Sequence, residues 1–106
     1  MSGLVRVLLY HRTDDEGGIE AAYHKVSDEL AGVPGLLGNE LLRSVHEPGA
    51  FLVLSTWRDR AAFDSWEQGA GHKASTAPLR PYRDVANPYA LGVFEQQAAY
   101  EGGDQP

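Results

Sequence analysis

The sequence predicts an α+β protein with a four-stranded antiparallel sheet and helices on one face of that sheet. Apolar β-branched runs and amphipathic stretches follow one another in the order β-α-β-β-α-β, which is the ferredoxin-like arrangement. The chain has 106 residues, enough for one hydrophobic core and too few for two. Three of the predicted strands are apolar on both sides, although two helices can cover only one face. We therefore expect a homodimer that packs through the uncovered sheet face.

The first strand is predicted over residues 4–11 and the first helix over residues 19–30. Apolar side chains of the strand alternate to both of its sides. In the helix, apolar residues recur at steps of three and four, and Gly32 and Pro34 follow its end. The buried stripe of this helix consists of Ile19, Ala22, Tyr23, Val26 and Leu30.

Residues 36–45 and 51–56 are predicted to pair as a hairpin, because Pro48 and Gly49 form a turn between them. Residues 59–68 are predicted to form the second helix, since the carboxylate of Asp59 can accept hydrogen bonds from its first turn. The glycines that follow end this helix and place His72 on a bend. The apolar face of the helix consists of Ala62, Phe63 and Trp66.

The rest of the chain is predicted to contain one loop, one strand and one tail. Residues 69–81 are small and polar and include two prolines, which favours a loop near the functional site with a broken helical turn. Residues 88–96 form the last strand, apolar on both faces. We expect one domain over residues 1–97, followed by a short acidic, loosely ordered tail over residues 98–106.

Composition excludes several classes of function. The formal net charge is -6 and basic residues do not cluster, which argues against nucleic-acid binding and against an anionic membrane surface. No apolar run approaches the roughly 20 residues that span a bilayer. The chain lacks cysteine, so disulfides, thiolate metal sites and cysteine nucleophiles are excluded. The N-terminal segment has no basic start or cleavage site, and we expect a cytoplasmic protein.

The four histidines are the candidates for proton transfer. His72 is the strongest, because it closely follows Trp66 and an imidazole titrates near pH ~6.5; alternatively it is a loop side chain bonded to backbone. His11 ends the first strand and either points between sheet and helices or lies in solvent. His24 is expected at the edge of the apolar stripe and His46 at the surface. The common catalytic motifs are absent, and little supports a metal site.

Several motifs occur together in an order that points to one family. A tryptophan directly follows the third strand, an Ala-Phe pair and a second tryptophan lie on the second helix, and a histidine follows. A Pro-Gly-Leu segment precedes the second strand. This order resembles the antibiotic biosynthesis monooxygenase (ABM) superfamily of dimeric ferredoxin-like α+β barrels, over roughly residues 4–95. The matching residues are Trp57, Ala62, Phe63, Trp66 and His72, with Pro34, Gly35 and Leu36.

The resemblance implies a monooxygenase that needs no metal or organic cofactor and oxidises an aromatic, polyketide-like phenol or anthrone with O₂. The deprotonated substrate reduces oxygen itself, so the protein needs a dry pocket, hydrogen-bond donors and a proton acceptor. His72 is then the expected base, and Tyr10 and His11, which stand on a strand where the family carries an Asn, orient the substrate. The expected substrate-binding residues are Trp57, Phe63, Trp66 and Val53, the last at a position where the monooxygenases carry a further Asn.

Two alternatives remain open. The resemblance extends to haem-degrading enzymes, for which His72 would be the axial ligand and Trp66 would ruffle the macrocycle. The missing Asn residues instead favour a non-catalytic dimer that binds a small hydrophobic molecule or stabilises another enzyme.

Overall fold

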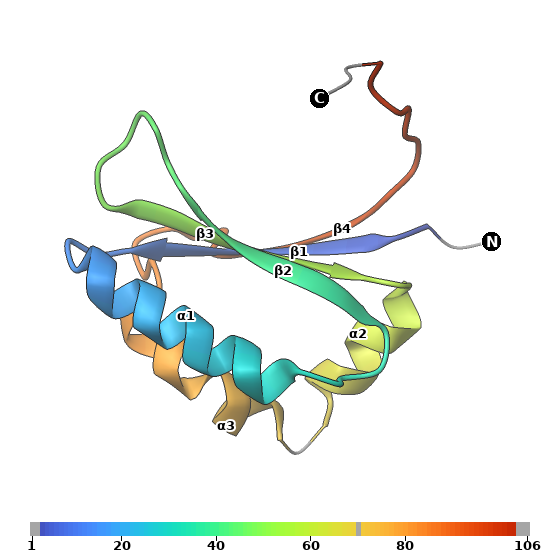
Figure 1. Cartoon of the computed structure of the whole chain (residues 1–106), viewed down its shortest axis with the longest axis horizontal. Coiled ribbons are helices and arrows are strands. Elements are labelled where there is room, and N and C mark those ends of the chain that lie inside the picture. The colour runs from blue at the N-terminus through green and yellow to red at the C-terminus, as the bar shows by residue number, and fades with distance from the viewer. Residues whose placement is uncertain (1–2, 70, 104–106) are drawn as a thin grey trace.

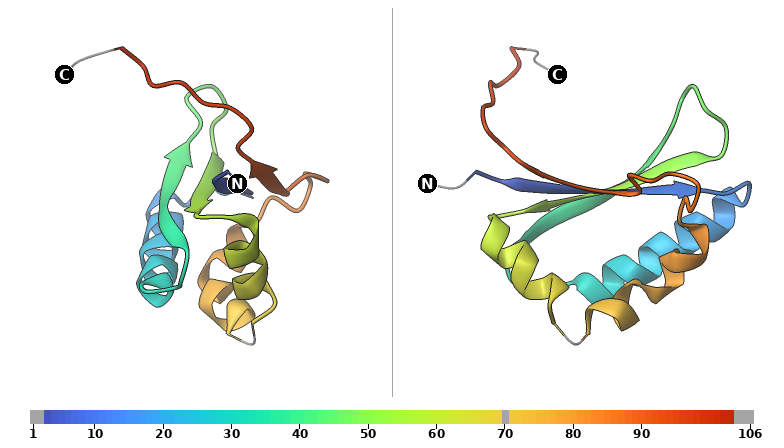
Figure 2. Two further views of the ribbon diagram at one scale, coloured as in Figure 1. Left: turned by 90° about the vertical axis from the view of Figure 1, so that its right-hand side faces the viewer. Right: turned by 180° about the vertical axis from the view of Figure 1, so that it is seen from behind.

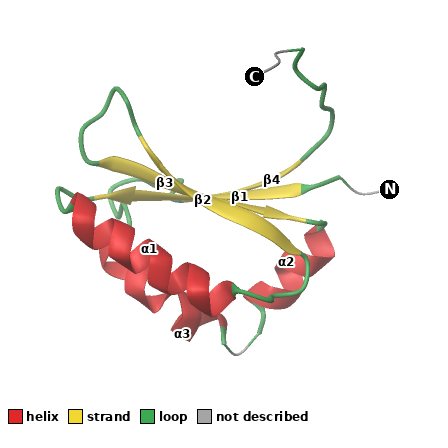
Figure 3. Ribbon diagram, viewed as in Figure 1, coloured by secondary structure: helices red, strands yellow, loops and turns green. Residues whose placement is uncertain are grey.

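The structure, a computed structural model, describes residues 3–69 and 71–103 as one sheet with helices on one of its faces (Figure 1). The helices α1, α2 and α3 all lie below the sheet, and among the described residues no helix lies over its upper face (Figure 3). The predicted β-α-β-β-α-β arrangement is confirmed. The elements are β1 (Val5–Arg12), α1 (Glu16–Leu30), β2 (Leu36–Arg43), β3 (Ala50–Trp57), α2 (Arg60–Glu67), α3 (His72–Thr76), the 3₁₀ helix η1 (Ala77–Tyr82) and β4 (Leu91–Glu95).

The sheet has the strand order β2-β3-β1-β4, and all three pairings are antiparallel. In β1, Val5 and Val7 are buried beneath the sheet, and every second residue faces the other way. On that upper face the apolar side chains of three strands stand opposite one another in register. The pairs are Leu8 with Leu54, Tyr10 with Leu52 and Leu42 with Leu52.

The helices form two columns under the sheet, α1 in one and α2 with α3 in the other (Figure 2). Asp15 caps the N-terminus of α1, because its carboxylate accepts a hydrogen bond from the amide of Gly18 at 2.9 Å. Asp59 caps α2 in the same way through the amide of Ala62, as predicted. The buried residues of α1 are Ile19, Val26 and Leu30.

The connection after α2 differs from the prediction of a loop. His72 does not lie on a bend: it is the first residue of α3, and η1 continues directly from α3. Within this short helix the hydroxyls of Ser75 and Thr76 donate hydrogen bonds to backbone carbonyls four residues earlier. Small polar residues therefore form helix here, because packing of η1 against α1 compensates for their weak propensity.

The last strand is shorter than predicted, since β4 begins at Leu91 and residues 88–90 lie outside it. Beyond it, residues 96–103 have no regular structure and leave the sheet on the side away from the helices (Figure 2). Within residues 3–69 and 71–103, no helix is long and apolar enough to cross a membrane.

Candidate functional site

Three aromatic rings pack together where the end of β3 meets α2. The ring centroids of Trp57 and Trp66 are 5.3 Å apart, and those of Trp57 and Phe63 are 5.5 Å apart in an edge-on arrangement. Trp57 is 1% exposed, and its indole nitrogen donates to the hydroxyl of Ser55 at 3.0 Å, so its one polar atom is paired. These rings form one wall of a cavity that is partly open to solvent.

The cavity lies between the sheet and the helices and encloses about 60 Å³, room for only a few waters. Its apolar lining comes from both layers of the fold. The helices contribute Val26, Leu30, Phe63, Trp66 and Leu79, and the strands contribute Val7, Leu9, Val53 and Trp57. All four residues expected to bind substrate, Trp57, Phe63, Trp66 and Val53, therefore line one space.

His11 reaches this cavity from β1 and is 2% exposed. Its Nδ1 lies 2.9 Å from the carbonyl oxygen of Leu9, so Nδ1 donates and Nε2 keeps its lone pair. Burial lowers the pKa of His11, the hydrogen bond to Leu9 opposes this shift, and the positive charge of Arg83 adds to it. The imidazole is therefore neutral near pH 7 and has one nitrogen available to accept a proton.

The structure does not bring Tyr10 and His72 to the cavity. Tyr10 is next to His11 in β1, so its side chain lies on the opposite face of the sheet, beside Leu42 and Leu52. His72 packs edge-on against Trp66 with ring centroids 4.5 Å apart, and it is half-buried but not among the lining residues. His72 thus contacts a ring of the cavity wall without itself lining the cavity.

Several polar residues of the cavity were not predicted from the sequence. Asn39 of β2 lines it, and its side-chain oxygen accepts a hydrogen bond from Ser27 of α1 at 3.1 Å. The hydroxyl of Tyr23 donates to the backbone oxygen of Asn39 at 3.1 Å. An asparagine inside a strand was a usable signal, since strands disfavour this residue. Two arginines, Arg80 and Arg83, complete the polar lining together with Ser55 and Thr76.

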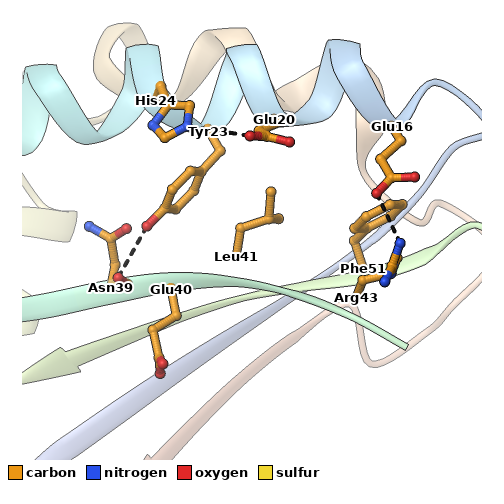
Figure 4. Close-up of a pocket in the computed structure, with 9 residues that line it drawn as sticks. All are labelled: Glu16, Glu20, Tyr23, His24, Asn39, Glu40, Leu41, Arg43 and Phe51. Atoms are coloured by element: carbon orange, nitrogen blue, oxygen red, sulfur yellow. Dashed lines mark hydrogen bonds and ion pairs between the residues drawn. The ribbon is translucent and has the colours of Figure 1, made fainter. Parts of the chain in front are cut away.

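A second, open groove of about 530 Å³ runs along the surface between α1 and β2 (Figure 4). Tyr23 and Asn39 belong to both spaces, so they separate the groove from the cavity. Arg43 forms an ion pair with Glu16 across the groove at 3.1 Å, and on α1 the imidazole of His24 lies 3.8 Å from the carboxylate of Glu20. All four of these side chains are well exposed, so the groove has the character of ordinary surface.

Within residues 3–69 and 71–103, no three His, Asp or Glu side chains gather in a way that could hold a metal ion. The polar groups that line the cavity, namely His11, the two arginines and the hydroxyl and amide groups of its wall, can transfer protons and stabilise charge.

Known proteins share this fold and part of this sequence. SnoaB, a cofactor-independent oxygenase from Streptomyces nogalater, has a similar structure with a TM-score of 0.72, at 15% sequence identity over 98% of this chain and 100% of SnoaB. Protein SchA of Streptomyces halstedii is 27% identical over 99 residues, 93% of this chain and 26% of SchA. A 42.8 kDa protein in the whiE locus of Streptomyces coelicolor is 33% identical over 58 residues, 55% of this chain and 15% of that protein.

The chain thus spans about a quarter of SchA and less of the second relative, whereas it covers the whole length of SnoaB. At 15% identity the likeness to SnoaB establishes the fold. Residues 3–77, which contain β1 to α3 and most of the cavity wall, match the family described as antibiotic biosynthesis monooxygenase. This chain belongs to the antibiotic biosynthesis monooxygenase family.

Proposed function

We propose that the chain is a monooxygenase that needs no metal or organic cofactor and oxidises an aromatic phenol or anthrone with O₂. The observation that supports this most directly is a buried, neutral histidine in the wall of a largely apolar cavity. An anthrone loses a proton from carbon to give an anion rich enough in electrons to reduce O₂. The overall change is R₂CH₂ + O₂ → R₂C=O + H₂O, which balances without a further reductant.

In this mechanism His11 is the base. Its Nε2 takes the proton from the substrate, and the backbone oxygen of Leu9 holds Nδ1–H and stabilises the imidazolium that forms. The substrate anion gives an electron to O₂, the two radicals combine as a peroxide, and loss of water leaves the ketone. The proton that His11 holds returns with the leaving hydroxide. Trp57, Trp66 and Phe63 supply the flat apolar wall and exclude water.

The size of the cavity has a consequence for binding. Pockets for drug-sized ligands usually enclose roughly 300–1,000 Å³, and this cavity encloses about 60 Å³. A tricyclic substrate therefore needs the wall to move, and we assign the movement to α3 and η1, which contribute Thr76, Leu79 and Arg80. Short helical elements of this kind open at lower cost than the sheet.

The test is oxygen consumption with 1,8-dihydroxyanthrone, with the quinone product followed by absorbance. His11→Gln should lower kcat by about 10²- to 10⁴-fold, the usual contribution of a general base. His72→Gln should retain most of the activity, because His72 packs against Trp66 and is not among the residues that line the cavity. The exposed His46→Gln is the matched control. Loss of activity in the His72 variant alone would return the role of base to His72.

Failure of the wild type to oxidise the anthrone would contradict the proposed activity and favour one of two other functions. A haemin titration then separates them: a Soret band that saturates at one haem per chain and disappears in His72→Ala would indicate haem binding. Its absence would leave a non-catalytic protein that binds a small hydrophobic molecule.

We also propose that a second copy of the chain covers the upper face of the sheet. Leu8, Leu52 and Leu54 lie there in register at the centre, and Phe94 at its edge is 61% exposed. A contiguous apolar surface of this kind is typical of an association site.

A further inference from the structure

We propose that Arg83 binds the oxygen anion that the substrate develops when it loses its proton to His11. The cavity then takes aromatic compounds whose ketone or phenol oxygen becomes negatively charged, and not neutral hydrocarbons. This inference rests on the proposed function, because it assigns a partner to the anion formed in that reaction.

The backbone places Arg83 beside His11. The two residues face each other in an isolated antiparallel bridge, and residues paired in this way carry their side chains on the same face. Both line the cavity below the sheet. The next residue, Asp84, points to the other face, where its carboxylate lies 3.6 Å from Nε of Arg12. Strand alternation thus places the arginine and this carboxylate on opposite faces.

The charges around the cavity favour an anion. The chain has a formal charge of -6, yet Asp and Glu are absent from the cavity lining and two arginines are present. The other titratable groups that face the cavity are His11 and Tyr23. Five arginine–carboxylate pairs and one His24–Glu20 contact occur among residues 3–69 and 71–103, and Arg83 takes part in none of them. Its guanidinium is therefore available to a ligand.

Of the two arginines, Arg83 is the better placed. Nη2 of Arg80 donates to the backbone oxygen of Lys73 at 2.8 Å, so Arg80 connects η1 to α3. Arg83 also lies close enough to His11 for its charge to affect the imidazole. The positive charge of Arg83 by itself opposes protonation of His11. It favours proton transfer from the substrate only when the substrate oxygen, which becomes negative, contacts the guanidinium. Arg83 would thereby select substrates that can place an oxygen at that point.

The experiment uses 1,8-dihydroxyanthraquinone, a dye that the protein cannot oxidise further and that changes colour when its phenol ionises. The pKa of the bound dye is measured by absorbance in wild-type protein and in Arg83→Gln. We expect wild type to lower this pKa by about one unit relative to free dye, a tenfold stabilisation of the anion, and Arg83→Gln to abolish the shift. Arg83→Lys should keep part of it, since the charge remains but the planar donor pair is lost.

Arg43→Gln is the matched control, because it removes one positive charge from the exposed groove and not from the cavity. An unchanged shift in Arg83→Gln, a shift lost in Arg80→Gln instead, or no binding of the dye to wild type would overturn the inference. The dye is never turned over, so the two proposals fail separately. A shift that depends on Arg83 without anthrone oxidation would refute the proposed activity alone.

Discussion

His11 is the residue in which stability and chemistry depend on the same proton. The side chain is almost fully buried, and its bond to the backbone oxygen of Leu9 leaves Nδ1 satisfied inside the protein. Burial also lowers the pKa of the imidazole, which keeps Nε2 free to accept a proton from substrate. Protonation without substrate would place a charge in an apolar space and destabilise the fold.

The free energy of unfolding should therefore fall as the pH drops below about 6.5. In that range the unfolded chain binds a proton at His11 that the folded chain does not bind, because the pKa of this group is lowered in the folded state. His11 makes its full contribution to the free energy of unfolding at pH values above its pKa in the unfolded chain. That contribution is lost as the pH falls through the pKa of His11 in the folded protein. Urea unfolding between about pH 7 and pH 5 measures this slope.

The His11→Gln variant should lose that part of the pH dependence, whatever its stability at pH 7. His46→Gln removes an exposed histidine from the same chain and should leave the slope unchanged. Equal slopes in wild type and His11→Gln would mean that the folded protein binds the proton at His11 as readily as the unfolded chain does.

At the scale of elements, the order and type of the strands and helices could be predicted because each has a local signal. Asp59 caps α2 as expected, and the apolar period of α1 matches its buried side. The place of His72 could not be predicted in this way. Whether residues 72–76 form a turn or a helix depends on packing of α3 and η1 against α1, which involves residues far apart in sequence.

A second prediction concerns the two glycines of the connection between α1 and β2. We expect Gly35→Ala to destabilise the protein more than Gly32→Ala does. Both glycines have positive φ, +84° and +87°, so alanine costs about 1–2 kcal/mol at each. A Cβ on Gly35 would in addition collide with the Cβ of Ala62 in α2, whereas a Cβ on Gly32 meets nothing within 4 Å.

Urea midpoints of the two glycine variants give the comparison directly, and the difference between them isolates the contact with α2. The backbone oxygen of Gly35 also accepts a hydrogen bond from the amide of Arg58 at 2.8 Å, so the glycine cannot simply move away. Equal losses of stability would mean that α2 shifts freely and does not fix this corner of the cavity.

At the scale of the whole molecule, the two faces of the sheet have different chemistry. The lower face holds the cavity with its arginines, and the upper face carries the paired apolar side chains of β1 and β3. The sequence predicted two apolar faces, but not which polar residues join the cavity, because that depends on strand register. Tyr10 and His11 show this: adjacent positions in β1 belong to different surfaces.

The upper face leads to the last prediction, that the chain is a dimer in solution and that Leu54→Glu makes it a monomer. Leu54 stands on β3 between Leu8 and Glu40 of the neighbouring strands. A carboxylate there would lose its water in a sheet-to-sheet interface and face Glu40, so association should weaken severely. Val85→Glu adds the same charge to a side chain that is 93% exposed in a connecting segment and should leave the dimer intact. Sedimentation equilibrium of the three proteins measures their mass, and a wild type with the mass of one chain would refute the interface.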